Sequence, residues 1–193
     1  QNAFFDLLFL HRHSPSMRPY YDWKFSGAAS IEAVQPADHP VILELIRRLE
    51  GVQCAAVAAH WLETQPHAFS LFRDHHRKLL AVVQMLVLRR FEAVDLATDP
   101  ALCLAHAHAR QNAPLRAGEA LLLQRYWPTD EGGPGSTSYN LLALLSTRYW
   151  LSTPGLAWAF IVTPDGDQLE PMFNHLGFSS VRTGAGKPHT GLF

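Results

Sequence analysis

The sequence predicts an α/β domain in which a mixed central sheet carries helices on both faces. From residue 31 onward, short aliphatic runs alternate with segments whose apolar residues recur at helical spacing. Two runs in the middle of the chain follow each other across a polar turn, whereas the later ones are separated by helices, as in a mixed sheet. The 193 residues are 48% hydrophobic and 17% charged, so one domain with a sizeable core is expected and wholesale disorder is excluded.

Turn and cap residues set the boundaries of the expected elements. Asp38 is the expected N-cap of the first helix, and Gly51 ends that helix. Pro66 stops the second helix, residues 74–77 form a polar hairpin turn, and Gly177 closes the last helix. In order, we expect a strand at 31–34, helices at 41–49 and 52–62, strands at 68–73 and 79–88, a helix at 99–111, a strand at 119–127, a helix from 136 or 137 to 151, a strand at 157–162, a helix at 167–176, a strand beginning over 178–181, and a tail at 184–193 that is loose or forms a final edge strand.

Residues 1–30 differ in composition from the rest of the chain. They are rich in aromatic, His and Arg side chains, and Pro15 and Pro19 interrupt any long helix. We therefore expect an N-terminal aromatic arm or linker over 1–30 and one domain over 31–193. The chain begins with Gln1 rather than Met, which suggests a piece of a longer protein, so the arm would pack on this domain or on a neighbouring one.

The charge balance and the cysteines exclude several classes of function. Lys and Arg number 16 and Asp and Glu 17, for a net charge of −1, which argues against a protein that coats nucleic acid. Cys54 and Cys103 lie in helix-like stretches rich in Ala and Leu, so they are expected to be small buried hydrophobes in a cytoplasmic protein. No apolar run reaches the about 18 residues of a membrane span, and the apolar start at 4–10 lacks the leader and cleavage site of a signal peptide.

Two segments and a loop between them carry a family resemblance. Residues 31–39, Ile-Glu-Ala-Val-Gln-Pro-Ala-Asp-His, read as a strand and an acidic turn, and residues 169–178 are a helix that ends in Leu-Gly-Phe. Between them, residues 130–135 place glycines between a strand and a helix. Over about residues 31–181 these features resemble the GNAT N-acetyltransferase superfamily, although the Gln or Arg that opens its pyrophosphate signature is Asp130 here. The resemblance implies a GNAT fold and an enzyme that transfers an acetyl group from acetyl-CoA to an unidentified amine.

The loop suits a diphosphate on physical grounds as well. Glycines let the backbone approach an anion closely, and the helix that follows adds N–H groups and a partial positive end. A plain surface loop capped by Ser or Thr is the alternative. In the resembling fold, the pantetheine pairs with backbone where the fourth strand splays from the fifth, here opposite 157–160. The residues expected to bind the cofactor are Gln124, Arg125, Tyr126, Trp127, Gly132, Gly133, Gly135, Ser136 and Thr137.

Two side chains on the expected fourth strand are candidates for proton transfer. Acyl transfer to an amine requires that the amine be neutral and that the leaving thiolate be protonated. Glu119 at the start of this strand is the candidate base, and Tyr126 near its end is the candidate acid. A solvated strand-end carboxylate and a half-buried aromatic are the respective alternatives.

No metal site is expected. His11 and His13 have no Cys or carboxylate at ligand spacing, and His106 and His108 diverge on a predicted helix. The sequence also lacks the Gly-x-Ser-x-Gly, Gly-Lys-Ser/Thr and His-Glu-x-x-His motifs.

Departures from the family pattern motivate a second interpretation. Asp130 and Glu131 place carboxylates beside the diphosphate, Pro134 removes an N–H, and Phe173 replaces the tyrosine that often protonates the thiolate. The alternative is a non-catalytic GNAT-like sensing or docking module of a larger multidomain protein. A third interpretation is a thioester decarboxylase or acyl-carrier-protein loading domain on the same fold. The expected partners are acyl-CoA and an amine, without nucleic acid or membrane, while other domains of a longer chain and a homodimer remain open.

Overall fold

The strands form one mixed sheet, as predicted. The computed structural model describes residues 13–15, 29–129, 136–163, 166–181 and 191–192. In these residues the sheet has the order β1–β2–β3–β4–β5–β6. Neighbouring strands are antiparallel except β4 and β5, which are parallel. The strands are β1 (Ala29–Ala33), β2 (Phe69–Asp74), β3 (Leu79–Leu88), β4 (Ala120–Pro128), β5 (Leu156–Thr163) and β6 (Gly191–Leu192).

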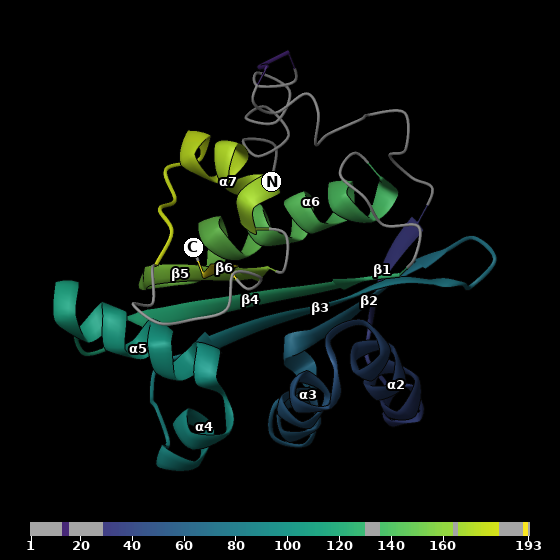
Figure 1. Cartoon of the computed structure of the whole chain (residues 1–193), viewed down its shortest axis with the longest axis horizontal. Helices are drawn as coiled ribbons and strands as arrows, with labels where there is room; N and C mark the ends of the chain where they lie inside the picture. The colour runs from purple at the N-terminus through teal and green to yellow at the C-terminus, as the bar shows by residue number, and fades with distance from the viewer. Residues whose placement is uncertain (1–12, 16–28, 130–135, 164–165, 182–190, 193) are drawn as a thin grey trace.

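Helices cover both faces of this sheet (Figure 1). One face carries α6 (Thr137–Ser152) and α7 (Gly166–His175). The other carries α2 (His39–Glu50), α3 (Val52–Thr64), α4 (Ala93–Thr98) and α5 (Pro100–Asn112), together with the short 3-10 turns η3 (Pro36–Asp38) and η4 (Pro66–Ala68). The predicted layers are therefore confirmed.

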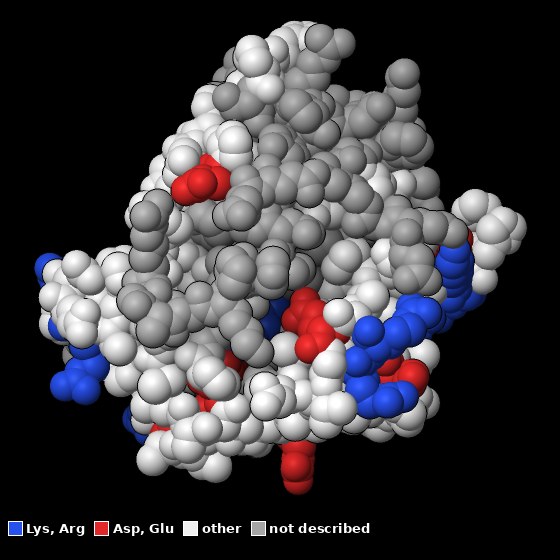
Figure 2. Space-filling model, viewed as in Figure 1, with Lys and Arg blue, Asp and Glu red and all other residues white. Residues whose placement is uncertain are grey.

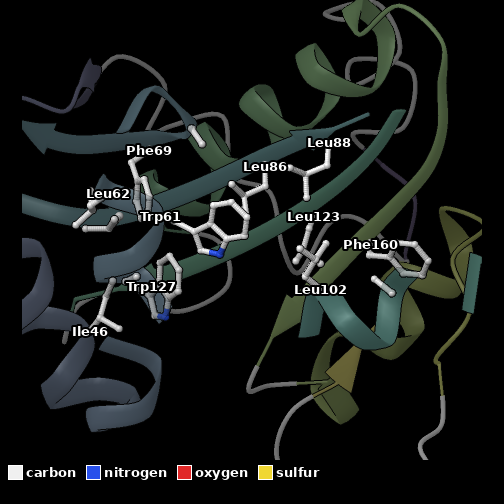
Figure 3. Close-up of a cluster of buried hydrophobic side chains, with 14 of the residues drawn as sticks. Ile46, Trp61, Leu62, Phe69, Leu86, Leu88, Leu102, Leu123, Trp127 and Phe160 are labelled. Carbon is white, nitrogen blue, oxygen red and sulfur yellow. The ribbon is translucent and has the colours of Figure 1, made fainter. Parts of the chain in front are cut away.

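Side chains that alternate between the two faces of the sheet divide the core into two clusters. On β3, Val82 and Leu86 pack in the cluster that faces α2, α3 and α5, whereas Val83 and Met85 pack in the cluster that faces α6 and α7. This period of two follows from the pleat of a strand that is covered on both faces. Figure 3 shows the first cluster, whose labelled members are Ile46, Trp61, Leu62, Phe69, Leu86, Leu88, Leu102, Leu123, Trp127 and Phe160.

The hairpin turn between β2 and β3 forms where the polar run predicts it. The Asp74 carboxylate accepts the backbone N–H groups of His76 and Lys78, both at 2.9 Å. Arg77 adopts a φ of 67°, a left-handed conformation found in tight turns. Likewise Gly51, with a φ of 91°, separates α2 from α3 and supplies a backbone angle that side chains disfavour.

Asp38 precedes α2 as expected, but its side chain does not cap that helix. Its carboxylate instead accepts the Gln35 N–H at 2.9 Å and pairs with the Arg73 guanidinium at 2.9 Å. The side chain therefore closes the η3 turn and ties it to β2.

The cysteines also differ from the expectation that both are buried. Cys103 is exposed and Cys54 is half-buried, and both are free thiols.

The end of the chain matches the prediction in part. Residues 178–181 are not a strand, but the edge strand expected within 184–193 is present as β6 at Gly191–Leu192, where it pairs with Val162 and Thr163 of β5. The Val181 N–H donates to the Leu192 carbonyl at 2.7 Å, so residues 178–181 are joined to β6 by a backbone hydrogen bond although they form no strand. The short helix α4 was not predicted, because six residues are too few to show a helical period. Most of the expected arm, at 1–12 and 16–28, lies outside the described residues.

Charged side chains of both signs share the face shown in Figure 2. Arg73 and Arg77 both pair with Glu32, at 3.6 and 2.6 Å, and Arg47 pairs with Glu44 at 2.7 Å. These pairs leave no single-sign stripe on α2 or on the β2–β3 hairpin. No helix in the described ranges is long and apolar enough to cross a membrane.

Candidate functional site

Strand β4 runs on past the end of its pairing with β5. The last β4–β5 pairs are Gln124 with Ile161 and Arg125 with Val162. Residues 126–128 of β4 pair only with β3, and the Thr129 N–H continues this contact by donating to the Leu80 carbonyl at 2.9 Å. The two strands thus part after Arg125, and their backbones no longer pair with each other over the last three residues of β4.

The register differs from the sequence expectation. Gln124 and Arg125 face residues 161–162, not 157–160, and both still belong to the β4–β5 ladder. An irregularity between Ala120 and Leu121 contributes to this offset, and aliphatic runs do not reveal such a shift. The stretch of β4 that is free of β5 is therefore 126–128, which is shorter and later than expected.

Helix α6 follows residues 126–128 of β4 in the sequence, after one connecting loop. Ser136 is its N-cap, and the Ser136 hydroxyl accepts the Tyr139 N–H at 3.5 Å and lies 3.0 Å from the Ser138 hydroxyl. Thr137 is the first helical residue. A 16-residue helix places a partial positive charge at this end. The connecting residues 130–135, which include Gly132, Gly133 and Gly135, lie outside the described residues.

Three of the side chains expected to line the cofactor site on β4, those of Gln124, Arg125 and Trp127, are buried. Trp127 is 2% exposed and stacks on Phe69, with ring centroids 6.5 Å apart. The Arg125 side chain lies on the face of α3 and α5, where Asp99 and Gln84 bind it, so its charge is not directed at a ligand. Gln124 is 3% exposed, and its Oε1 has no hydrogen-bond partner among the described residues. The backbone groups of Gln124 are directed at β5 and those of Arg125 and Trp127 at β3, so the backbone of these three positions is engaged in the sheet.

Glu119 and Tyr126 are not brought together. Glu119 lies just before β4, and seven residues at about 3.3 Å each separate the two by about 23 Å. The Glu119 carboxylate accepts the Arg116 N–H at 2.7 Å and so closes the turn that enters the strand. Glu119 is therefore too far from the α6 end of β4 to act there. The backbone of Tyr126 pairs with Val83 at that end, and its side chain lies outside the description.

Phe173 of α7 takes a place in the apolar cluster on the α6 face. It is 5% exposed and lies 6.0 Å from Phe178, ring centroid to centroid. A phenyl ring supplies no proton, so this position contributes packing alone. His175, two residues further on, is exposed at the end of the helix, as its helical spacing from Phe173 predicts.

A buried polar network beneath β4 was missed by the sequence reasoning. Asp99, which is fully buried, forms an ion pair with Arg125 and accepts the Trp61 indole N–H at 2.9 Å. Arg125 also donates to Gln84 Oε1 at 3.0 Å. Arg125 is the one charged residue of the strand segment 120–128, and this is the signal that could have pointed to a buried acidic partner.

The chemistry of the remaining described groups is limited. Burial, with Glu50 as the second cause, raises the pKa of the Cys54 thiol to about 11, so this thiol stays protonated and is a poor nucleophile. Within the described residues, no group of three or more His, Cys, Asp and Glu side chains is arranged to hold a metal ion.

Comparison with known proteins identifies the architecture. No protein-family model and no curated protein matches the sequence. Among solved structures, the chain is similar to a histone acetyltransferase HPA2 and related acetyltransferase from Corynebacterium glutamicum, with 14% identity, 86% of this chain and 94% of that chain covered, and a TM-score of 0.50. It is also similar to the spermidine/spermine N-acetyltransferase SpeG from Vibrio cholerae (8% identity, 87% and 91% covered, TM-score 0.51) and to the C-terminal condensation domain of Ebony (9% identity, 85% and 96% covered, TM-score 0.53). At such identities the likeness shows the fold alone, and that fold is the one of the GNAT acetyltransferases.

Proposed function

We propose that this protein is an acyl-CoA-dependent N-acyltransferase that moves an acetyl group from acetyl-CoA to an amine. The observation that carries the proposal is the end of β4 that does not pair with β5. Residues 126–128 pair with β3 alone, extend beyond the β4–β5 ladder and lead to the N-terminus of α6. The likeness to acetyltransferases across most of the chain supports it.

The donors at this end of the sheet fit the proposed cofactor. The N–H and C=O groups of Tyr126, which are directed away from β3, have no β5 partner in the ladder, which suits an amide-bearing chain such as pantetheine. Ser136 and Thr137 at the positive end of α6 suit a diphosphate. We assign the intervening glycines, Gly132, Gly133 and Gly135, to the same diphosphate.

Acetyl-CoA would supply an activated thioester carbonyl. A backbone N–H of the free β4 stretch would polarise that carbonyl, and Tyr126 remains the proposed proton donor to the leaving thiolate. Glu119 has no part in this proposal because it lies at the other end of β4.

The free thiols of Cys54 and Cys103 support a cytoplasmic location.

Titration of acetyl-CoA into the protein tests the proposal directly. Calorimetry at high micromolar ligand is expected to show saturable heat, and the same ligand is expected to raise the melting temperature. Gly133→Asp, which adds a carboxylate to the loop, should abolish both effects. If the unsubstituted protein shows neither heat nor a thermal shift, the proposal is wrong.

A second candidate is a non-catalytic GNAT-like sensing or docking module. Phe173 favours it, since a buried phenyl on α7 contacts Phe178 where a proton donor is often needed. This candidate predicts that coenzyme A binds but that no amine in a panel of polyamines, peptides and aminoglycosides is acetylated. Turnover that is lost in Gly133→Asp would contradict it.

A further inference from the structure

The pair of Asp99 and Arg125 joins four elements of the fold in one buried network. Asp99 Oδ1 accepts the backbone N–H groups of Ala101 and Leu102, both at 3.1 Å, which caps α5, and it also pairs with Arg125. Asp99 Oδ2 accepts the Trp61 indole of α3. Through Arg125, which lies on β4 and donates to Gln84 of β3, the network reaches from both helices to the centre of the sheet.

Stability alone does not explain this pair. A buried ion pair loses the hydration of both charges, and replacing such a pair with apolar side chains of similar size is often neutral or stabilising. The best-attested use of a buried polar group in an apolar core is to specify one register among several. Such a role requires that the rest of β4 leave its register open.

The aliphatic residues of β4 specify its register weakly. On the α3 and α5 face, the strand presents Leu121, Leu123, Arg125 and Trp127 in turn. A slip of two residues against β3 keeps every side chain on its own face, and at one rung it merely puts Leu123 in the place of Leu121. Two side chains lose their partners: Trp127 leaves its stack on Phe69, and the slip separates the charge of Arg125 from Asp99 and from Gln84, its partner on the same rung.

We propose that Asp99 and Arg125 form a register lock for β4, and that they act as positioning residues for the candidate acyl-CoA cleft. Arg125 is the last residue of β4 that pairs with β5. Fixing its rung therefore fixes 126–128 as the stretch without a β5 partner. Asp99 can pair with Arg125 only when α5 is packed against the sheet, because Asp99 is the N-cap of that helix. The link to acyl-CoA rests on the proposed function, whereas the register does not.

The register can be measured without any ligand. Cross-strand backbone contacts observed by NMR identify the rungs that join Gln84 to Arg125 and Leu86 to Leu123. The test variant replaces the pair with apolar side chains, Asp99→Leu with Arg125→Met. The matched control, Asp38→Leu with Arg73→Met, removes a partly buried pair of 2.9 Å that joins η3 to β2 and contains no residue of β3 or β4.

We expect one set of contacts in the unsubstituted protein and in the control, and additional contacts shifted by two residues in the test variant. Acetyl-CoA affinity should fall by the factor by which the native register is depopulated, about twofold when half of the molecules have slipped. A test variant that keeps a single native set of contacts overturns the lock. If the unsubstituted protein binds no acetyl-CoA, the proposed function fails while the register result stands.

A milder variant covers the case in which the apolar replacement does not fold. Asp99→Asn keeps one acceptor oxygen for the helix cap, but it loses the acceptor for the Trp61 indole and the negative charge that holds Arg125. We expect amide hydrogen exchange over 121–127 to become faster than in the control, because the strand samples the slipped pairing. Exchange over 121–127 that matches the control would also overturn the lock.

Discussion

Asp99 and Arg125 are buried partners from different layers of the fold, since Asp99 caps helix α5 and Arg125 lies on strand β4. Removing one partner leaves the other charge buried without compensation. We expect Asp99→Ala to lower the free energy of unfolding by about 3–5 kcal/mol, measured by urea denaturation. Glu44→Ala, which removes a solvent-exposed pair with Arg47, should cost less than about 1 kcal/mol. Equal losses in the two variants would contradict the central place of Asp99 in the core.

The N-cap of α6 allows charge to be tested separately from helix stability. Asp and Asn both cap helices about as well as Ser, so Ser136→Asp and Ser136→Asn should both fold with melting temperatures near that of the unsubstituted protein. Only Ser136→Asp places a carboxylate at the proposed diphosphate position, and an unscreened contact of this kind near the surface costs about 1 kcal/mol or more. Calorimetry with acetyl-CoA should therefore show weaker binding in Ser136→Asp alone. Equal affinities would exclude a diphosphate at this helix end.

His106 should make stability depend on pH. Burial, and next the charge of Arg110, lower the pKa of His106 below its ordinary 6.5, and its ring stacks on Phe91 with centroids 4.2 Å apart. The unfolded chain then takes up this proton more readily, so the His106 contribution is complete above about pH 6.5 and is lost as the pH falls below it. Melting temperatures at pH 7 and pH 5 should differ less in His106→Gln than in the unsubstituted protein. His67→Gln, at an exposed histidine, is the control, and a similar flattening there would contradict the assignment.

Gly155 occupies a position that no larger residue fits. Its φ is 67°, and a Cβ there would lie 2.7 Å from the Gly118 carbonyl oxygen, which already accepts a hydrogen bond from Arg89. Gly155→Ala should therefore cost more than the about 1–2 kcal/mol of a left-handed backbone alone. Gly177→Ala is the comparison, because Gly177 has a φ of 85° with nothing within 4 Å of its Cβ position. Thermal unfolding that ranks Gly177→Ala as the worse variant would refute this reading of the turn.

Local patterns predicted the elements well, because their signals lie within a few residues. The hairpin of β2 and β3 followed from a polar turn between aliphatic runs, and α5 followed from Asp99 before Pro100. For the short strand β6, the sequence left two outcomes open, a loose tail or an edge strand within 184–193. It consists of two residues whose strand character comes from pairing with Val162 and Thr163, and this pairing is a tertiary contact.

The site was harder to predict than the fold, for the same physical reason. The parting of β4 from β5 was expected over 124–127, but the pairing ends only after Arg125, whose buried partner, Asp99, lies 26 positions away in the sequence. Glu119 was chosen by strand position alone, and its carboxylate closes a local turn with Arg116 instead. Backbone accessibility between two strands has no signature in the residue types that form them.

The helix pair α4–α5 also has a consequence for how the chain reaches its native state. It separates Leu88 from Leu121, the nearest paired residues of β3 and β4, by 33 positions along the chain, where a tight hairpin would separate them by only a few. Each doubling of such a loop adds about 0.6 kcal/mol of closure entropy, and pairing between distant segments is slow. The centre of the sheet is therefore expected to assemble late, after α5 has begun to form, and the polypeptide would expose the aliphatic edge of β3 during that interval.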